Sequence, residues 1–224
     1  MTFWRQAVEI ARVDLVVERR AGETFRIVLP FSIVALMVFP LALDLQLGIV
    51  STVGIGVFWA LGILFGMQVA LRQSASDTPE RRDLHVLSGV DPAARFTGRA
   101  LSGGVLMTAY LGLMLVAMAV LFDPELPGGG WPVLLVSTVL VAVGLTELGT
   151  LAGEVTTGLR SRTPLASLIV APLALPLVIG GSQSVEAVER DTSILPWILL
   201  LIASDLALAV AGVALAKPLE EATQ

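Results

Sequence analysis

The sequence predicts an all-α, polytopic membrane protein with six transmembrane helices, in a single domain of residues 1–224. Of its residues, 55% are hydrophobic and only 15% are charged, whereas globular proteins carry about 25% charged residues. A helix needs roughly 17–25 residues to cross a hydrocarbon layer of about 30 Å. Six apolar stretches meet this length: Ile27–Leu43, Gly48–Leu71, Leu101–Phe122, Trp131–Gly153, Leu165–Gly181 and Ile194–Ala216.

The basic residues indicate which ends of the predicted helices share a side of the membrane. Of the 14 basic residues, all except Arg190 lie before the first stretch, between the second and third, between the fourth and fifth, or after the sixth. Cytoplasmic loops carry an excess of Lys and Arg, so we expect these segments and both termini in the cytoplasm. The remaining loops are acidic, with Asp44, Asp123, Glu125, Glu186, Glu189 and Asp191.

The composition also excludes several kinds of chemistry. The chain has no cysteine and a single histidine, His85, which excludes disulfides, thiolate catalysis and multi-histidine metal sites. Its formal net charge of −5 argues against nucleic-acid binding. The sequence lacks the Gly-x-x-x-x-Gly-Lys-Ser/Thr loop that holds ATP phosphates. We therefore expect no catalytic residue, no metal and no directly bound cofactor, and a membrane domain that another subunit supplies with energy.

Residues 1–26 predict an amphipathic helix that lies along the membrane surface before the first transmembrane helix. Apolar side chains recur at steps of three and four along it: Trp4, Ala7, Val8, Ala11 and Leu15. Phe3 and Trp4 provide aromatic anchors, and Arg5 and Arg12 belong to the charged face, as in helices that lie in the interface. A helix packed on the ends of the transmembrane helices is the other interpretation, and the two are compatible.

The segment 72–100 is the largest connection between the predicted membrane helices, and we call it the connector. It contains signals for a short capped helix, with Asp77-Thr78 and Pro79 at the start and Gly89 at the stop. Asp91-Pro92 repeats the start signal before the third stretch. This exposed helix could dock into a groove on a soluble partner; the alternative is a solvated connector helix.

Two acidic residues fall inside the predicted membrane helices, Glu147 in the fourth and Asp205 at the middle of the sixth. A central acid costs roughly 2.5–3.5 kcal/mol on insertion scales, and no basic residue lies within the stretches to pair with it. One interpretation is a neutral carboxyl that is hydrogen-bonded to Thr146, Ser204 or a neighbouring helix. The other is a place in a polar path for a substrate.

Proline residues interrupt the fifth stretch. Pro172 and Pro176 each remove a helical hydrogen bond and predict a kink or a break, and we expect the stretch to end at Gly180-Gly181. In transporters such irregular backbone is tolerated where it lines a cavity. A static kink that only serves packing is equally consistent with the pattern.

The order of these segments resembles that of the CcmB family, the membrane permeases of the cytochrome c maturation haem exporter. The charged lead Asp14–Thr24 runs into the first stretch, and Phe58–Gly66 leads into the connector. The later segments are the D-P-A-A-R-F-T-G-R-A-L run at Asp91–Leu101, Gly149–Leu151, Arg160-Ser-Arg162 and the proline-rich Pro164–Pro176. The resemblance covers essentially the whole chain, and it rests on six stretches, length and segment order together.

The resemblance implies a permease of the type-2 ABC exporter kind, with an N-terminal interfacial helix, in the prokaryotic cytoplasmic membrane. Its implied partners are a CcmA-like ATPase subunit, which binds the ATP, a CcmC-like haem-handling membrane protein and a second copy of the chain. Haem is then the possible substrate rather than a resident cofactor.

By position, the resemblance also makes Thr78–Ser88 the segment that couples the permease to the ATPase subunit. Its implied contact residues are Thr78, Glu80, Arg81, Arg82, Asp83, Leu84 and Leu87. Glu147 departs from the small apolar residue that the family pattern leads us to expect. Two other functions stay open, namely a permease for a drug, lipid or polysaccharide, and a structural subunit that positions haem-handling partners without moving substrate.

Overall fold

The computed structural model describes residues 2–22, 24–42, 47–75, 87–155 and 172–221. These residues form helices joined by turns, with no strand among them, so the predicted all-α class is confirmed. Five helical segments are long and apolar enough to cross a membrane: Thr24–Ala42, Val53–Gln73, Pro92–Phe122, Gly130–Val155 and Leu195–Leu219. The chain is therefore a multi-pass membrane protein.

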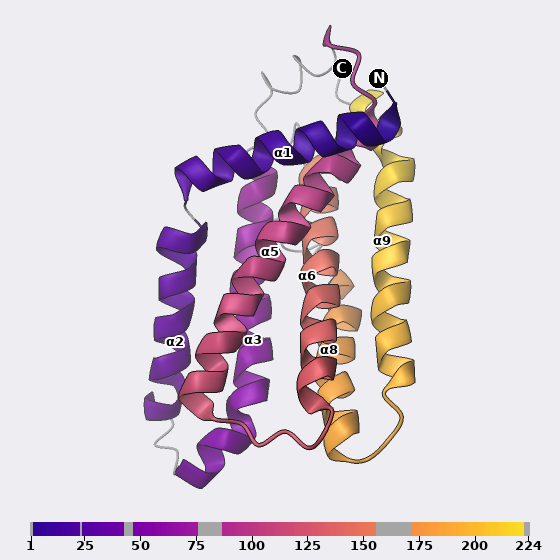
Figure 1. Ribbon diagram of the computed structural model, residues 1–224. Coiled ribbons are helices and arrows are strands. Elements are labelled where there is room, and N and C mark those ends of the chain that lie inside the picture. The colour runs from indigo at the N-terminus through magenta and orange to yellow at the C-terminus, as the bar shows by residue number, and fades with distance from the viewer. Residues whose placement is uncertain (1, 23, 43–46, 76–86, 156–171, 222–224) are drawn as a thin grey trace.

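In the described part of the chain, six upright helices form a bundle, and a seventh lies across one end of it (Figure 1). The crossing helix is α1 (Phe3–Ala21), which joins α2 (Leu29–Ala42) through the short π-helix η1 (Thr24–Val28). The other upright helices are α3 (Leu47–Ala75), α5 (Pro92–Phe122), α6 (Gly130–Val155), α8 (Leu175–Glu189) and α9 (Leu195–Glu221). Since successive helices alternate in direction, α1 and the last turn of α9 lie at the same end (Figure 1).

Charge divides the two ends of the bundle. The end that carries α1 also holds the last turn of α3 with Arg72 and the first turns of α5 with Arg95 and Arg99 (Figure 1). We call it the arginine-rich end. At the opposite end, the connection between α5 and α6 carries Asp123 and Glu125. The separation of charge that the sequence predicts is thus present in the fold.

The core is built mainly from α3, α5 and α6. α6 is the most enclosed of the five membrane-spanning candidates, with 67% of its apolar window buried, against 17% for the window of α9. Phe58, Met107, Tyr110 and Leu145 are among the largest side chains that are fully buried in the described part of the chain. α2 and α9 therefore present most of their apolar surface outward, as helices in contact with lipid do.

The start of α5 follows the predicted capping signals. Gly89 adopts a left-handed φ of 64°, and Asp91 caps the helix because its side chain accepts a hydrogen bond from the N–H of Ala93 at 2.9 Å. Pro92 occupies the first turn, where its missing N–H costs nothing. The predicted stop and restart at these residues are confirmed, and α5 continues unbroken through the third apolar stretch.

α1 docks on α5 through small residues. Ala7 and Ala11 are buried, and Gly98 of α5 approaches so closely that a Cβ there would lie 2.6 Å from the carbonyl oxygen of Ala7. The C-terminus of α1 is closed by Gly22, at a left-handed φ of 65°, whose N–H donates to the Glu18 carbonyl. The position of α1 across the bundle is therefore fixed by its contact with α5 and by the turn at Gly22, where the chain leaves α1.

The predicted end of the fifth stretch is wrong. Gly180-Gly181 does not end the helix, because α8 continues to Glu189, and part of the loop expected at 182–193 is helical. These glycines instead permit close packing, since a Cβ at Gly180 would meet Leu201 at 2.7 Å. α8 begins at Leu175 with Pro176 in its first turn, after a turn at Ala174. The part of the predicted stretch before Pro172, residues 165–171, lies outside the described residues.

Candidate functional site

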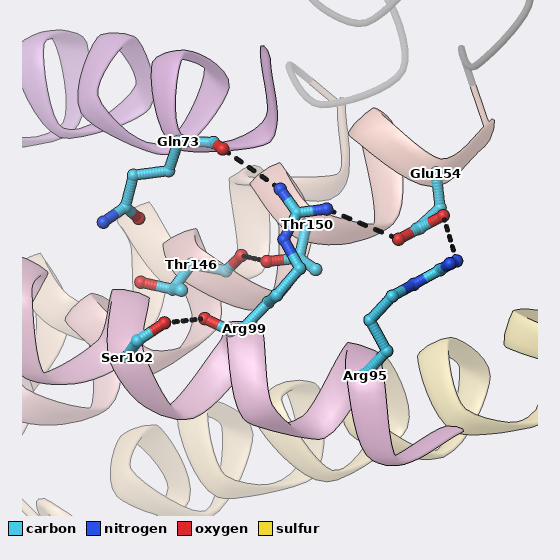
Figure 2. A network of polar contacts seen from close by, with 7 residues as sticks. All are labelled: Gln73, Arg95, Arg99, Ser102, Thr146, Thr150 and Glu154. Atoms are coloured by element: carbon cyan, nitrogen blue, oxygen red, sulfur yellow. Dashed lines mark hydrogen bonds and ion pairs between the residues drawn. The ribbon is translucent and has the colours of Figure 1, made fainter. Parts of the chain in front are cut away.

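A cluster of buried charges lies at the arginine-rich end, and we call Arg95, Arg99 and Glu154 the ion cluster (Figure 2). Arg95 and Arg99 are four residues apart on α5, so they share one helix face. Glu154 lies in the last turn of α6, next to that face. Their side chains are 3%, 10% and 5% exposed respectively, which makes the cluster an interior feature of the protein.

One carboxylate serves two guanidinium groups. Glu154 Oε2 accepts a hydrogen bond from Arg95 Nη2 at 3.3 Å, and Glu154 Oε1 lies 3.5 Å from Arg99 Nη1 (Figure 2). Arginine suits this geometry because its planar fork offers several donors in fixed directions and stays charged. The ion cluster thereby ties the beginning of α5 to the end of α6.

Arg99 also reaches a third helix. Its Nη2 donates a hydrogen bond of 3.0 Å to the backbone carbonyl oxygen of Gln73, in the last turn of α3 (Figure 2). The predicted connector is shorter in the structure, because its first residues, up to Ala75, belong to α3 and its last residues, from Pro92, belong to α5. The bond from Arg99 to Gln73 therefore joins the two helices between which the connector runs. Because Glu154 is followed at once by the end of α6, the ion cluster also holds the exit of the next connection at that end.

The hydroxyl groups beside the ion cluster belong to the local helices. Ser102 Oγ donates to the Arg99 carbonyl at 3.0 Å, and Thr150 Oγ1 donates to the Thr146 carbonyl at 2.8 Å (Figure 2). The charged groups therefore have one another and backbone carbonyls as their partners in this view. The network is held by three helices, each contributing part of it.

The length of α5 explains how charged side chains fit into a membrane helix. Its 31 residues extend for about 46 Å at 1.5 Å per residue, whereas the hydrocarbon layer is about 30 Å thick. α5 is thus longer than the hydrocarbon layer is thick, and this length allows its first turns, with Arg95 and Arg99, to lie beyond the hydrocarbon at the arginine-rich end. A buried ion pair is costly to assemble and far more costly to break, so such a cluster holds helices in one arrangement.

The ion cluster was not predicted from the sequence. Arg95 and Arg99 served there as charges that orient the chain and as part of the Asp91–Leu101 run, and Glu154 fell just beyond the predicted fourth stretch. The available signal was the spacing of four between two arginines at the start of a helix, which places both on one face. Spacing on α5 alone carries no information about which acid on another helix faces it.

The two predicted acids lie at the contact of α6 with α9. Asp205 points at α6, where a Cβ on Gly144 would lie 2.5 Å from its Oδ1, and Gly144 is three residues before Glu147 on the same helix face. Glu147 and Asp205 are 8% and 9% exposed. The structure thus brings these two residues from separate helices to one region of the bundle.

The expected hydrogen bonds of these acids to neighbouring hydroxyl groups are absent. Thr146 Oγ1 donates to the Ala142 carbonyl and Ser204 Oγ donates to the Leu200 carbonyl, because each hydroxyl finds an acceptor on its own helix. Within the described residues, both carboxylate oxygens of Asp205 and Oε2 of Glu147 have no hydrogen-bond partner. The hydrogen-bonded interpretation through Thr146 or Ser204 is therefore wrong.

The predicted ATPase contacts fall largely outside the described residues. This holds for Thr78, Glu80, Arg81, Arg82, Asp83 and Leu84. The one described member, Leu87, is 84% exposed and is helical, directly before the turn at Ser88-Gly89. An exposed leucine at this point is accessible to another protein.

The predicted interfacial residues lie in the first ten residues of α1. Trp4, Arg5 and Arg12 are exposed, and the Phe3 ring packs edge-on against the Trp4 ring at 5.3 Å between centroids. Only the narrow Ala7–Ala11 side of α1 is buried against the bundle, so apolar residues such as Val8 and Val16 are exposed as well. α1 therefore combines a packed stripe with an apolar surface that faces away from the bundle.

Taken together, a bundle of apolar helices that crosses a membrane, with its charge gathered at one end, defines a multi-pass helical membrane protein. Comparison with known families assigns it further. The sequence model of the CcmB protein family matches residues 5–222, and the chain belongs to that family.

Curated relatives agree with this assignment. The chain is 30% identical over 189 residues to a protein named Heme exporter protein B from Pseudomonas aeruginosa, which covers 80% of this chain and 79% of the relative. It is 29% identical over 180 residues to Heme exporter protein B of Paracoccus denitrificans, with 77% and 79% covered. The protein of the same name from Rhodobacter capsulatus is 31% identical over 177 residues, with 77% and 79% covered.

Proposed function

We propose that this protein is the permease subunit of an ATP-driven haem exporter that acts in c-type cytochrome maturation. The names of its relatives and the family match support export of haem. A separate, CcmA-like subunit then hydrolyses ATP, since the sequence has no loop of the P-loop type. A CcmC-like membrane protein and a second copy of this chain complete the proposed complex.

The proposed orientation has the arginine-rich end and both termini in the cytoplasm. The positive-inside rule supports it, because the basic residues concentrate at this end of the described helices. α1 then lies in the inner membrane interface with Trp4 as an aromatic anchor. The connector and the connection after α6 both face the compartment that contains ATP.

The observation that carries the proposed coupling is the hydrogen bond of 3.0 Å from Arg99 to the Gln73 carbonyl, which joins the two helices between which the connector runs. A displacement of the connector, caused by a conformational change of the bound ATPase subunit, would move α3 and α5 together, because the two helices are joined at this point. The ion pair of Arg99 with Glu154 passes the same displacement to α6. Three helices of the bundle therefore respond to a contact made by residues 76–86.

Reversal of charge at Arg81 and Arg82 tests the docking of the ATPase subunit. We expect Arg81→Glu/Arg82→Glu to insert normally but to lose the co-purifying ATPase subunit, because both groups belong to the proposed contact. Affinity purification of the complex, followed by quantification of both subunits, measures this. Arg190→Glu is the matched control and should leave the subunit ratio unchanged, since Arg190 directly follows α8, whose last turn is at the end of the bundle opposite to α1 (Figure 1). ATPase recovery at the wild-type ratio in the double variant would refute the docking role.

Asp205 supplies a second test, for a polar path that a substrate follows between α6 and α9. Asp205→Asn keeps the size of the side chain and removes its charge, so we expect lower haem delivery at unchanged expression. Haem-dependent ATP hydrolysis by the purified complex and the yield of c-type cytochrome in cells measure it. Full activity in the variant would limit Asp205 to a structural role. Ser204→Ala, which changes the adjacent residue, is the control.

A further inference from the structure

A groove of about 540 Å³ opens between α5 and α9, and α6 closes its inner side. It follows α5 from Phe96 to Ala109, which is about 20 Å along the helix axis at 1.5 Å per residue. Its volume lies within the roughly 300–1,000 Å³ of small-molecule sites in proteins. An elongated occupant would fit its shape better than a compact one.

The walls of the groove are almost entirely apolar. Leu101, Val105 and Val213 line its mouth and are 44%, 58% and 40% exposed. They belong to helices that are long and apolar enough to cross a membrane, so the mouth faces the hydrocarbon chains of the bilayer. Phe96, close to the ion cluster in sequence, marks the end of the groove that is nearest to the arginine-rich end.

Glu147 is the exception among the lining residues, since it is the only ionisable side chain of the described residues that form the groove. It is 8% exposed, and its Oε2 has no hydrogen-bond partner in the described part of the protein. A buried polar atom without a partner is destabilising, and a charged group without one is more so. Asp205 adds a second carboxyl on the same side of α6, against Gly144.

We propose that this groove binds one phospholipid with a primary amine head group, with an acyl chain along α5 and the ammonium group at Glu147. The apolar length of the groove accommodates the chain, and the carboxyl at its wall provides a hydrogen-bond acceptor of the opposite charge. Two carboxyl groups in one region favour a cationic partner over an anionic one. In the proposed orientation this lipid comes from the cytoplasmic leaflet; the lipid site itself does not depend on the proposed cargo.

The test uses the full-length protein, purified with its partner subunits and reconstituted in vesicles of equal parts phosphatidylethanolamine and phosphatidylglycerol. After extraction into mild detergent, native mass spectrometry identifies the lipid that remains bound. We expect retention of phosphatidylethanolamine in preference to phosphatidylglycerol. In Glu147→Gln the apparent affinity should fall about tenfold, as expected for loss of a hydrogen bond to a charged group. Equal retention of both lipids, or an unchanged preference in Glu147→Gln, would overturn the proposal.

A pair of glycine variants on α5 provides an independent arm. Gly104 lines the groove, and a Cβ at this position would meet only the Cγ2 of Val143, at 4.0 Å. A leucine side chain in Gly104→Leu would therefore fill the groove and should abolish lipid retention. A Cβ at Gly112 would meet nothing within 4 Å, and Gly112 lies outside the groove, so Gly112→Leu should retain lipid as the wild type does. Equal retention in both variants would place the lipid elsewhere and contradict the site.

A second copy of the chain is the competing occupant. Because the sequence has no cysteine, Val105→Cys introduces a single thiol at the mouth of the groove. An added oxidant such as copper phenanthroline then accepts the two electrons and two protons of disulfide formation. A disulfide-linked dimer would show that the second copy occupies the groove and would overturn the lipid proposal, whereas a monomeric product supports it. Lipid retention is read without ATP hydrolysis, so failure of this proposal and failure of the proposed export function are distinguishable.

Discussion

Glu154→Ala is expected to lower the free energy of unfolding by about 3–5 kcal/mol, because removal of one partner of a buried ion pair leaves an uncompensated charge in the interior. Both guanidinium groups lose the carboxylate that they share at 3.3 and 3.5 Å. For a chain of 224 residues this corresponds to a fall in Tm on the order of 10 °C. Thermal unfolding in detergent, followed through the fluorescence of the four tryptophans, measures it.

The control is an acid whose ion pair is exposed. Glu186 Oε1 pairs with Arg190 at 2.5 Å, but the Arg190 side chain is 68% exposed, and such surface pairs contribute only about 0–1 kcal/mol. Glu186→Ala should therefore change Tm by a small fraction of the effect of Glu154→Ala. Similar changes in the two variants would mean that burial of the ion cluster does not govern its contribution. Glu154→Gln keeps a hydrogen-bond acceptor of the same shape, so its change in Tm should lie between those of Glu154→Ala and Glu186→Ala.

Gly149→Val is expected to destabilise the protein by about 3 kcal/mol through overpacking between α6 and α3. A Cβ at Gly149 would lie 2.5 Å from the Cβ of Ala70 and 3.0 Å from its carbonyl carbon and oxygen. Because two of these atoms belong to the backbone of α3, no side-chain rotation relieves the contact, and the helices have to separate. The same unfolding experiment measures the change.

Two further variants separate this steric effect from the effect of a helical valine as such. A Cβ at Gly56 on α3 would meet nothing within 4 Å, so Gly56→Val should change the free energy of unfolding by less than about 0.5 kcal/mol. Ala70→Gly combined with Gly149→Val removes the clash between the two Cβ atoms but not the contacts with the backbone, and only part of the stability should return. Equal losses in Gly149→Val and Gly56→Val would contradict the close approach of α3 and α6.

The sequence was sufficient for features that depend on local patterns. Composition and stretch length predicted the helical membrane class, and the turn at Gly89 and the start of α5 at Asp91-Pro92 follow from the conformations that glycine, aspartate and proline prefer. The end of α8 was missed because Gly180-Gly181 has two possible meanings. Glycine pairs end helices, but they also allow close packing against residues such as Leu201, and only the neighbouring helix decides between the two.

The candidate site depends on contacts between helices, which local patterns do not specify. Asp205 and Glu147 were conspicuous because acids are rare in apolar stretches, yet their proximity depends on how α9 packs on α6 at Gly144. Glu154 was inconspicuous in sequence, although it holds two arginines from a helix that begins some 60 residues earlier. Acids inside apolar stretches can thus be identified from the sequence. An acid at the end of a helix, where acids are common, can be identified only from its contacts with other helices.

The contact of Arg99 with the Gln73 carbonyl has a consequence for how the connector can evolve. Since the segment between these residues departs from and returns to neighbouring points on the bundle, it resembles an insertion whose ends are close together, a situation in which replacement of a segment is well tolerated. If the proposed complex with an ATPase subunit is correct, exchange of residues 76–88 for those of a relative should leave the membrane helices intact and change which ATPase subunit is bound. Partner choice and membrane architecture can then diverge separately, as two exchangeable parts of one chain.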